Sequence, residues 1–245
     1  MSGHSKWSTI KHKKAAKDIE KGKVFSKLSR IVTVSVIEGG GIPDPEKNIK
    51  LRLAIERAKA ANMPKDNIKR AIEKGVGPDK DTLKAVIYEA FATGGVNLLI
   101  LVTTDNTNRT LNEIRNIIDR GGGKLGSQGS VAYLFKKCGV IVFEKKSNAE
   151  DAIYTFADAL SSFDLDDDGA TITVYIPFEN LGKVQDHLEG LQASSQEVYY
   201  KPTVYVSVAN KDEAQKVLSL VEALEEHDDV NQVFTNFDIP EELLA

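Results

Sequence analysis

The stretch VIYEAFATGGVNLLILVT, residues 86–103, marks the point where the chain changes from helices to a sheet. Beyond Asp81 the spacing of apolar residues changes from about 3.6 to about 2, which is the change from helical to strand periodicity. Two strand-like runs, Val86–Phe91 and Val96–Thr103, flank the pair Gly94-Gly95, which predicts a hairpin. We therefore expect a helical region before this stretch and an α/β region after it.

Toward the N-terminus, the first two of four expected helices differ in polarity. Lysines recur at three- and four-residue steps from Ile10 to Lys21, so a mostly polar helix there would carry them along one stripe. Apolar residues at helical spacing predict a second helix over Lys23–Glu38, which a run of three glycines then ends.

The third and fourth helices are expected to complete a compact bundle. Asp44 as the N-cap and Pro45 in the first turn predict a helix that runs to about Asn62. A short helix follows the break at Met63-Pro64 and is expected to end at Gly75.

Toward the C-terminus, strands and helices alternate. A helix is expected from Thr110, which has the spacing of a capping box with Glu113. The expected elements after the hairpin are, in order, helix 110–119, strand 130–135, strand 140–143, helix 149–160, strand 170–176, helix 181–191, a weaker strand 197–200, strand 204–208, helix 212–226 and strand 230–236.

This order predicts a multi-domain α and α+β fold in which one domain interrupts another. The first α/β set lacks a second helix and closing strands, and the last segment of the chain supplies both. We expect a helical bundle over residues 1–77, a discontinuous α/β domain over 78–136 plus 203–245, and an inserted α/β domain over 137–202. Both α/β domains are expected to be ferredoxin-like.

The formal charge of −4 hides a strong separation along the 245 residues. Residues 1–77 carry 18 Lys and Arg against 8 Asp and Glu, a formal charge of +10, and the rest of the chain carries −14. A basic region joined to an acidic one indicates that only one end of the protein meets an anionic partner.

The basic residues near the N-terminus are the candidate nucleic-acid site. Lys and Arg bind phosphates by releasing condensed counterions, and an exposed Trp can stack on an unpaired base. A solvated helix face is the alternative interpretation, but few acidic residues accompany this run. The candidate residues are His4, Lys6, Trp7, Lys11, His12, Lys13, Lys14, Lys17, Lys21, Lys23, Lys27 and Arg30.

The chemistry for reading bases is missing from this region. No zinc-finger spacing occurs, and no helix-turn-helix carries a reading helix rich in Asn, Gln and Arg. Contact with the nucleic-acid backbone or with structured RNA therefore suits the residues better than sequence-specific readout.

We expect no metal site. The segment Asp164–Gly169 has the D-x-D-x-D-G form of a calcium loop, but the position of the required Glu is Tyr175, so an acidic β-turn is the preferred interpretation. The four histidines are scattered, and Cys138 has no partner motif, so zinc is not expected.

Nor do we expect catalytic residues or a cofactor. Cys138 fits a small packing residue better than a nucleophile, and no glycine run has the form of a nucleotide-binding loop. The loop Thr104–Arg109, between a strand end and a helix start, could hold an anion. Helix capping explains its residues equally well.

The sequence resembles the YebC/PmpR family along nearly its whole length. The matching motifs are GHSKW, IKHKKAAKD, the Gly-Lys-x-Phe step at Gly22–Phe25, RLAIERAKAANMPKDNIKRAIEKG, TDNTNRT and GGGKLGSQGSVAYLF. The resemblance implies a helical domain followed by two α/β domains, the last inserted in the second, with cytoplasmic residence and no catalytic activity. Members are described as DNA-binding transcriptional regulators, and relatives include a mitochondrial translational activator and proteins linked to the ribosome.

The chain departs from the family pattern in two loops. The segment Gly41–Pro45 is longer than the usual form, and Ala90 and Ala92 replace glycines of the motif at Tyr88–Gly95. These replacements put in doubt any role that needs a flexible glycine backbone at Ala90 or Ala92.

Two functions remain open at the level of sequence. The chain is expected to be a DNA-binding transcriptional regulator or, alternatively, a translation factor that binds the ribosome or ribosomal RNA and eases elongation through proline runs. No apolar run approaches the ~20 residues that span a bilayer, and a single cysteine fits the reducing cytoplasm. The acidic domains are left to orient the protein or to meet the ribosome or another protein.

Overall fold

The computed structural model of the chain describes residues 21–78, 80–208 and 211–238, and these form two compact units. The first unit combines residues 21–134 with 204–238, and the second comprises residues 135–203. The division into three domains expected from the sequence stays a prediction.

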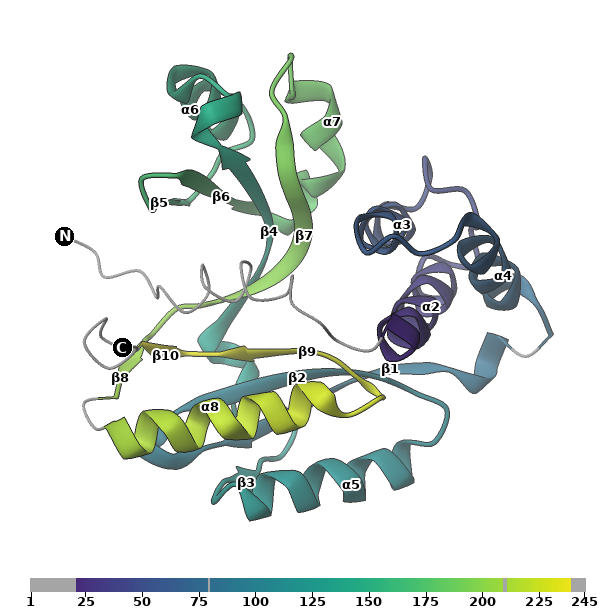
Figure 1. Cartoon of the computed structure of the whole chain (residues 1–245), viewed down its shortest axis with the longest axis vertical. Helices are drawn as coiled ribbons and strands as arrows, with labels where there is room; N and C mark the ends of the chain where they lie inside the picture. The colour runs from purple at the N-terminus through teal and green to yellow at the C-terminus, as the bar shows by residue number, and fades with distance from the viewer. Residues whose placement is uncertain (1–20, 79, 209–210, 239–245) are drawn as a thin grey trace. The chain divides into compact units, whose positions relative to one another are not determined.

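The described part of the first unit begins with helices α2 (Lys21–Glu38), α3 (Ile49–Ala60) and α4 (Lys65–Val76), which lie close together in Figure 1. Their buried apolar residues form a core of their own. Leu28, Val32 and Val36 of α2 pack on Leu51 and neighbouring apolar residues of α3 and α4. Gly75 lets α4 approach α2, because a Cβ at this position would lie 2.6 Å from the Cβ of Val36.

The start of α3 was predicted wrongly. Its N-cap is Asn48 rather than Asp44, and Asn48 Oδ1 accepts a hydrogen bond of 3.1 Å from the backbone N of Leu51. The buried amide of Asn48 also donates to the carbonyls of Ser35 and Ile42, both at 3.0 Å, which a carboxylate could not do. Asp44 instead stabilises the preceding turn by accepting from the backbone N of Glu46.

An antiparallel sheet completes the first unit in the order β3-β1-β2-β9. Its strands are β1 (Lys84–Phe91), β2 (Asn97–Thr104), β3 (Lys124–Leu125) and β9 (Val230–Thr235). The hairpin predicted at Gly94-Gly95 joins β1 to β2 through a short 3-10 turn. A further short pair, β8 (Val206–Ser207) and β10 (Phe237–Asp238), is parallel.

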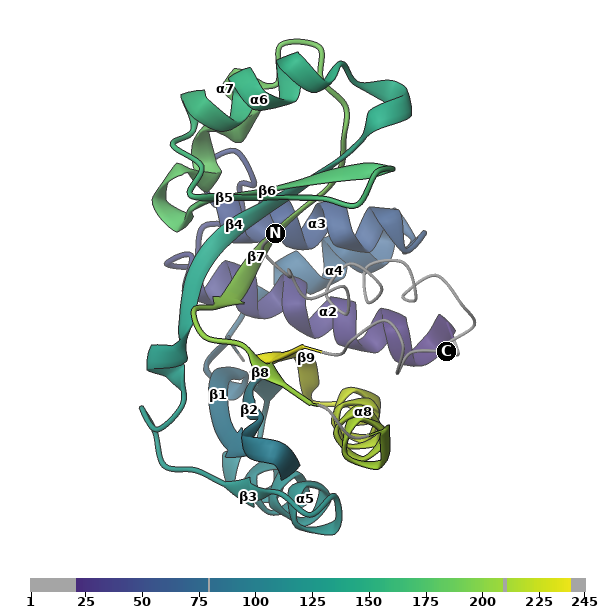
Figure 2. The same ribbon diagram turned by 90° about the vertical axis from the view of Figure 1, so that its left-hand side faces the viewer.

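Helices lie on both faces of this sheet. α5 (Thr107–Arg120) and α8 (Lys211–Glu226) cover one face, and α2 lies on the other (Figures 1 and 2). Leu98, Ile100 and Val102 alternate along β2 into the core under α5 and α8.

The capping box predicted for α5 was also wrong, because the helix starts one turn earlier. Asn106 is the N-cap and accepts from the backbone N of Arg109 at 3.1 Å, and Thr110 is buried inside the helix.

A buried carboxylate explains why residues 130–135 are not the strand that was predicted. Glu89, 4% exposed, accepts hydrogen bonds from the backbone N of Gly129, Val131 and Ala132. These donors are therefore not available to a sheet, and Ala132–Leu134 form a 3-10 turn before β4.

The second unit is a four-stranded antiparallel sheet with the order β5-β6-β4-β7. The chain runs through β4 (Phe135–Glu144), α6 (Glu150–Ala159), β5 (Asp164–Asp167), β6 (Thr171–Pro177), a 3-10 segment (Phe178–Lys183), α7 (Val184–His187) and β7 (Ala193–Pro202). This is a β-α-β-β-α-β order. The helix predicted over 181–191 is reduced to the 3-10 segment and the single turn of α7.

The acidic segment predicted as a turn contributes a strand. Asp164–Asp167 pair with β6, and only the residues after them turn. Lys201, whose side chain is 7% exposed, lies 3.2 Å from a carboxylate oxygen of Asp164 and 3.6 Å from one of Asp166, which compensates their charges inside the sheet.

Cys138 is a packing residue, as the sequence indicated. It is fully buried beside Val140 and Tyr175. Burial raises the pKa of its thiol to about 11, so the reactive thiolate is scarce at neutral pH.

Across the described residues, no helix combines the length and apolar character that crossing a bilayer requires.

Candidate functional site

Only three of the predicted nucleic-acid contacts have side chains that can be placed. His4, Lys6, Trp7, Lys11, His12, Lys13, Lys14 and Lys17 lie outside the described residues. Lys21 begins α2, but its side chain is also outside them. Lys23, Lys27 and Arg30 follow at four- and three-residue steps on α2, so they share one face of the helix.

Lys27 contacts the end of α8. Its Nζ donates a hydrogen bond of 2.5 Å to the backbone carbonyl of Glu225, in the last turn of that helix, where the helix dipole is negative. Burial lowers the pKa of Lys27, the nearby charges of Asp228 and Glu225 oppose that effect, and Lys23 and Arg30 add to it. Lys27 is therefore partly withdrawn from solvent by the acidic part of the same unit.

Arg30 forms an ion pair with Asp229, in the turn between α8 and β9. Nη1 of Arg30 also donates to the backbone carbonyl of Asp228 at 3.4 Å. The Asp229 side chain is only 3% exposed, whereas that of Arg30 is 35% exposed. The basic helix is thus held to the acidic turn by a carboxylate that is almost completely buried.

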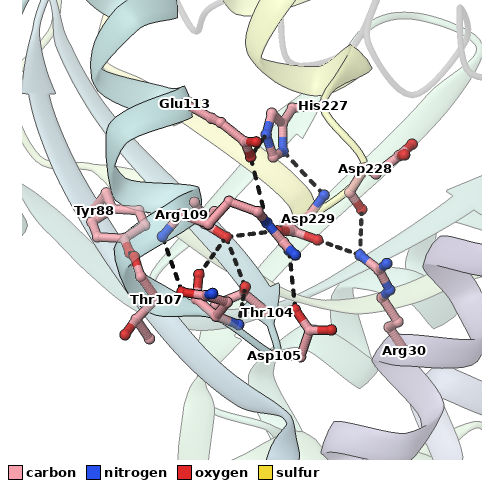
Figure 3. Close-up of polar contacts among 12 residues, drawn as sticks. Arg30, Tyr88, Thr104, Asp105, Thr107, Arg109, Glu113, His227, Asp228 and Asp229 are labelled. Carbon is pink, nitrogen blue, oxygen red and sulfur yellow. Dashed lines mark hydrogen bonds and ion pairs between the residues drawn. The ribbon is translucent and has the colours of Figure 1, made fainter.

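Asp229 binds two further groups from the start of α5 (Figure 3). Its Oδ2 lies 2.8 Å from Nη2 of Arg109 and accepts from Oγ1 of Thr110 at 2.6 Å. Its backbone carbonyl accepts from the N of Thr103 at 2.8 Å. One residue therefore joins α2, β2, α5 and the α8–β9 turn.

The surroundings of Asp229 favour its charged form. Burial alone would raise the pKa of Asp229, but hydrogen bonds from Thr110 and Arg109 and the charges of Arg30 and Arg109 outweigh it, so the pKa lies below its ordinary value. We call Arg30, Arg109, Thr110 and Asp229 the Asp229 cluster.

The cluster explains the loop Thr104–Arg109, for which the sequence left an anion site open. Asn106 caps α5, and Thr104 Oγ1 accepts from the backbone N of Asn106 at 2.9 Å. The cationic end of the loop, Arg109, binds the protein's own carboxylate at Asp229. Sequence reasoning missed Asp229 because its side-chain partners lie about 120 and 199 positions away.

The potential metal ligands around Asp229 do not fit a metal centre. Within the described residues, Glu113, His227 and Asp229 could each offer a ligand atom, and these atoms lie within 4.8 Å of one another. However, Nε2 of His227 is already 3.0 Å from Glu113, and both oxygens of Asp229 are engaged by guanidinium and hydroxyl groups. Two neighbouring guanidinium charges also oppose a cation.

Exposed cations continue on the other helices of the bundle. They are Arg57 and Lys59 on α3, and Lys65, Lys69, Arg70 and Lys74 on α4. Of these six exposed cations, only Lys69 forms an ion pair within the described residues, with Glu73 at 3.9 Å. The basic surface predicted near the N-terminus therefore extends over helices that sequence reasoning had treated only as packing elements.

Comparison with known proteins matches two consecutive stretches of the chain to one family. The model of the TACO1/YebC protein N-terminal domain matches residues 5–78, and that of the TACO1/YebC second and third domain matches residues 83–237. A "probable transcriptional regulatory protein" of Aquifex aeolicus is 44% identical over 100% of this chain and 98% of its own. A relative of the same description from Dictyoglomus thermophilum is 46% identical with the same coverage. The crystal structure of a conserved hypothetical protein from Aquifex aeolicus matches with a TM-score of 0.83 and 42% identity, covering 93% of this chain and 94% of that one.

Proposed function

This chain belongs to the TACO1/YebC family, and from that premise we propose that it regulates gene expression by binding nucleic acid through its basic helical region. The observation that carries the proposal is the separation of charge, +10 over residues 1–77 against −14 over the rest. The exposed cations of α3 and α4 support it, because they extend the basic surface. The proposal includes no catalytic residue, metal or cofactor.

The names of the relatives favour a transcriptional regulator that binds DNA. The second candidate is a factor that acts in translation by binding ribosomal RNA. One observation favours it: among the described residues of α2, α3 and α4 there is no Gln and a single Asn, Asn67, whose Oδ1 accepts from Arg70 of the same helix. Asn and Gln are the side chains that read adenine, so these helices are better suited to phosphates than to base edges.

The acidic turn limits which cations would meet the nucleic acid. Nζ of Lys27 donates to Glu225, and Nη1 of Arg30 is engaged by Asp228 and Asp229, so each can offer a phosphate only the N–H groups that remain. We therefore propose that the residues before α2 and the exposed cations of α3 and α4 make the main contacts, apart from Lys69, which is paired with Glu73. Direct contact of Lys27 and Arg30 with nucleic acid remains a prediction.

The proposal also covers the domains of the chain and its place in the cell. We propose three domains, with residues 137–202 inserted in the second, and residence in the cytoplasm. The acidic α/β domains would stay clear of the phosphates, since like charges repel, and are free to meet a protein partner.

Crosslinking in cells, followed by sequencing of the bound DNA and RNA, separates the two candidates. Discrete promoter peaks that survive removal of RNA by nuclease support the transcriptional role. Fragments of ribosomal RNA clustered at one site, without promoter peaks, support the translational role. Absence of enriched DNA and RNA would contradict both.

A salt titration tests the basic region directly. If six cations meet phosphates, log K should fall with log salt with a slope of about −4 to −5. Replacing Lys11, Lys13, Lys14 and Lys17 together with Glu should abolish binding while circular dichroism remains that of the wild type. Binding that is unchanged in this variant would refute the N-terminal assignment.

A further inference from the structure

We propose that a cavity between α2 and α4 binds one phosphate group of the nucleic-acid backbone. The cavity has a volume of about 240 Å³ and lies within the first unit. Arg30 of α2 and Arg70 and Lys74 of α4 line it. This inference rests on the proposed function and names a specific contact within it.

The positive charges that line the cavity are not balanced by acidic residues of the lining. None of the residues that line it is Asp or Glu. Arg30 is paired with Asp229, which is not part of the lining. Within the described residues, neither Arg70 nor Lys74 forms an ion pair with a carboxylate. Three cations around one small cavity repel one another, and a bound anion would relieve that repulsion.

The polar groups suit a tetrahedral oxyanion. Ser29 and Asn67 add a hydroxyl and an amide to the lining. The Ser29 hydroxyl makes no hydrogen bond to another described residue, so it is able to donate to a ligand. Arginine binds phosphate through two parallel N–H groups, and lysine binds it as a point charge. The remainder of the lining includes Ala71 and Leu83, which are buried and apolar.

The geometry of Arg30 and Arg70 is already constrained. The Asp229 carboxylate holds Arg30. Nε of Arg70 donates to the backbone carbonyl of Asp66 at 3.3 Å, and Nη2 donates to Asn67. Less side-chain entropy is lost on binding when the cations are held in advance.

The volume indicates a single phosphate rather than a whole nucleotide. Pockets that enclose a drug-sized ligand have volumes of about 300–1,000 Å³, above that of this cavity. A phosphate that remains attached to a nucleic-acid chain fits this size, because its sugar and base would stay outside.

Variants of α4 test the site with a matched control. Arg70→Gln and Lys74→Gln each remove one cation from the cavity, and Lys69→Gln removes one from the same helix outside it. Arg30 is left unchanged, since its loss would also break the pair with Asp229. Circular dichroism and the melting temperature check that each full-length variant folds.

The first measurement is the affinity for a 20-base-pair DNA duplex and for an RNA hairpin at several salt concentrations. Each lost contact should lower the slope of log K against log salt by about 0.9 on duplex DNA, which is about eightfold in K at 0.1 M salt. Lys69→Gln should change K by less than about twofold, because a charge that contacts no phosphate releases no counterion. If the cavity variants match Lys69→Gln on both nucleic acids, the backbone contact is refuted.

The second measurement is a titration of the wild type with inorganic phosphate, followed by NMR of the backbone amides. Shifts at Asn67, Arg70 and Lys74 that disappear in the Arg70→Gln/Lys74→Gln variant support the site. No shift at these residues overturns it, even if the protein binds nucleic acid elsewhere. A wild type that binds phosphate here but binds neither nucleic acid would refute the proposed function and the backbone contact together, and leave a site for free phosphate.

Discussion

Replacing Asp229 with Asn should destabilise the first unit more than the same loss of charge at any neighbouring carboxylate. The change keeps the shape of the side chain but removes its charge and replaces one acceptor oxygen with a donor. Arg30, Arg109 and Thr110 all donate to this carboxylate, so at least one donor would face the new amide.

The magnitude follows from burial. Breaking a fully buried ion pair costs about 3–5 kcal/mol, but Arg30 remains partly exposed at 35%, so water compensates part of the loss. Hydrogen bonds to a charged group contribute about 1.5–3 kcal/mol each. We expect Asp229→Asn to lower the free energy of unfolding by about 2–3 kcal/mol.

Urea unfolding followed by circular dichroism measures this loss, with Asp228→Asn as the control. Asp228 is the neighbouring residue and its side chain is exposed, so the same loss of charge there should cost less than about 0.5 kcal/mol. A double-mutant cycle of Arg30→Gln with Asp229→Asn should show a coupling of about 1–2 kcal/mol. Equal stability of the Asp228 and Asp229 variants would show that the cluster does not hold α2 to the turn.

Three more predictions concern acid, the thiol and the glycines. The pKa of Asp229 lies below its ordinary value, so its contribution to stability is complete above about pH 4 and is lost as the pH falls through the folded-state pKa. The difference in stability between wild type and Asp229→Asn should therefore narrow in acid, and a difference independent of pH would contradict the assignment. Cys138, with its thiol pKa raised to about 11, should resist alkylation by iodoacetamide at neutral pH until urea unfolds the protein; rapid labelling of the native chain, followed by mass spectrometry, would disprove its burial. Gly75→Ala should cost about 1–3 kcal/mol in urea unfolding, because the new Cβ meets Val36, whereas Gly22→Ala, with open space around it, should be neutral or stabilise by up to about 1 kcal/mol; similar effects at both positions would refute the close approach of α2 and α4.

Periodicity predicted the elements whose apolar residues face one core. The hairpin of β1 and β2 and the helices α2 and α4 follow from local spacing, because each buries one continuous face. Capping predictions failed at α3 and α5, where two capping residues lie within one turn or so of each other. Asn48 rather than Asp44 caps α3, and its amide also donates to backbone carbonyls of α2 and of the loop that follows α2. The local sequence around the cap does not show these partners.

The parts that the sequence did not reveal depend on distant charges. Asp164–Asp167 pair with β6 as a strand, and Lys201, 35 or more positions along the chain, offsets the charges of Asp164 and Asp166. In the sequence, Asp229 is one of two acidic residues before β9, yet it binds groups from α2, β2 and α5. The cations of α4 were visible in the sequence, but their convergence with Arg30 on one cavity arises only from the packing of α2 against α4.

The register of β4 and β7 brings the two ends of the second unit next to each other. Phe135, where that unit begins, is directly opposite Pro202, near where it ends, and neighbouring antiparallel strands lie about 5 Å apart. A bridge of a few residues would therefore span the gap and let the first unit close on itself. We therefore expect that residues 135–203 could be replaced or deleted while the strands of the first unit keep their connections.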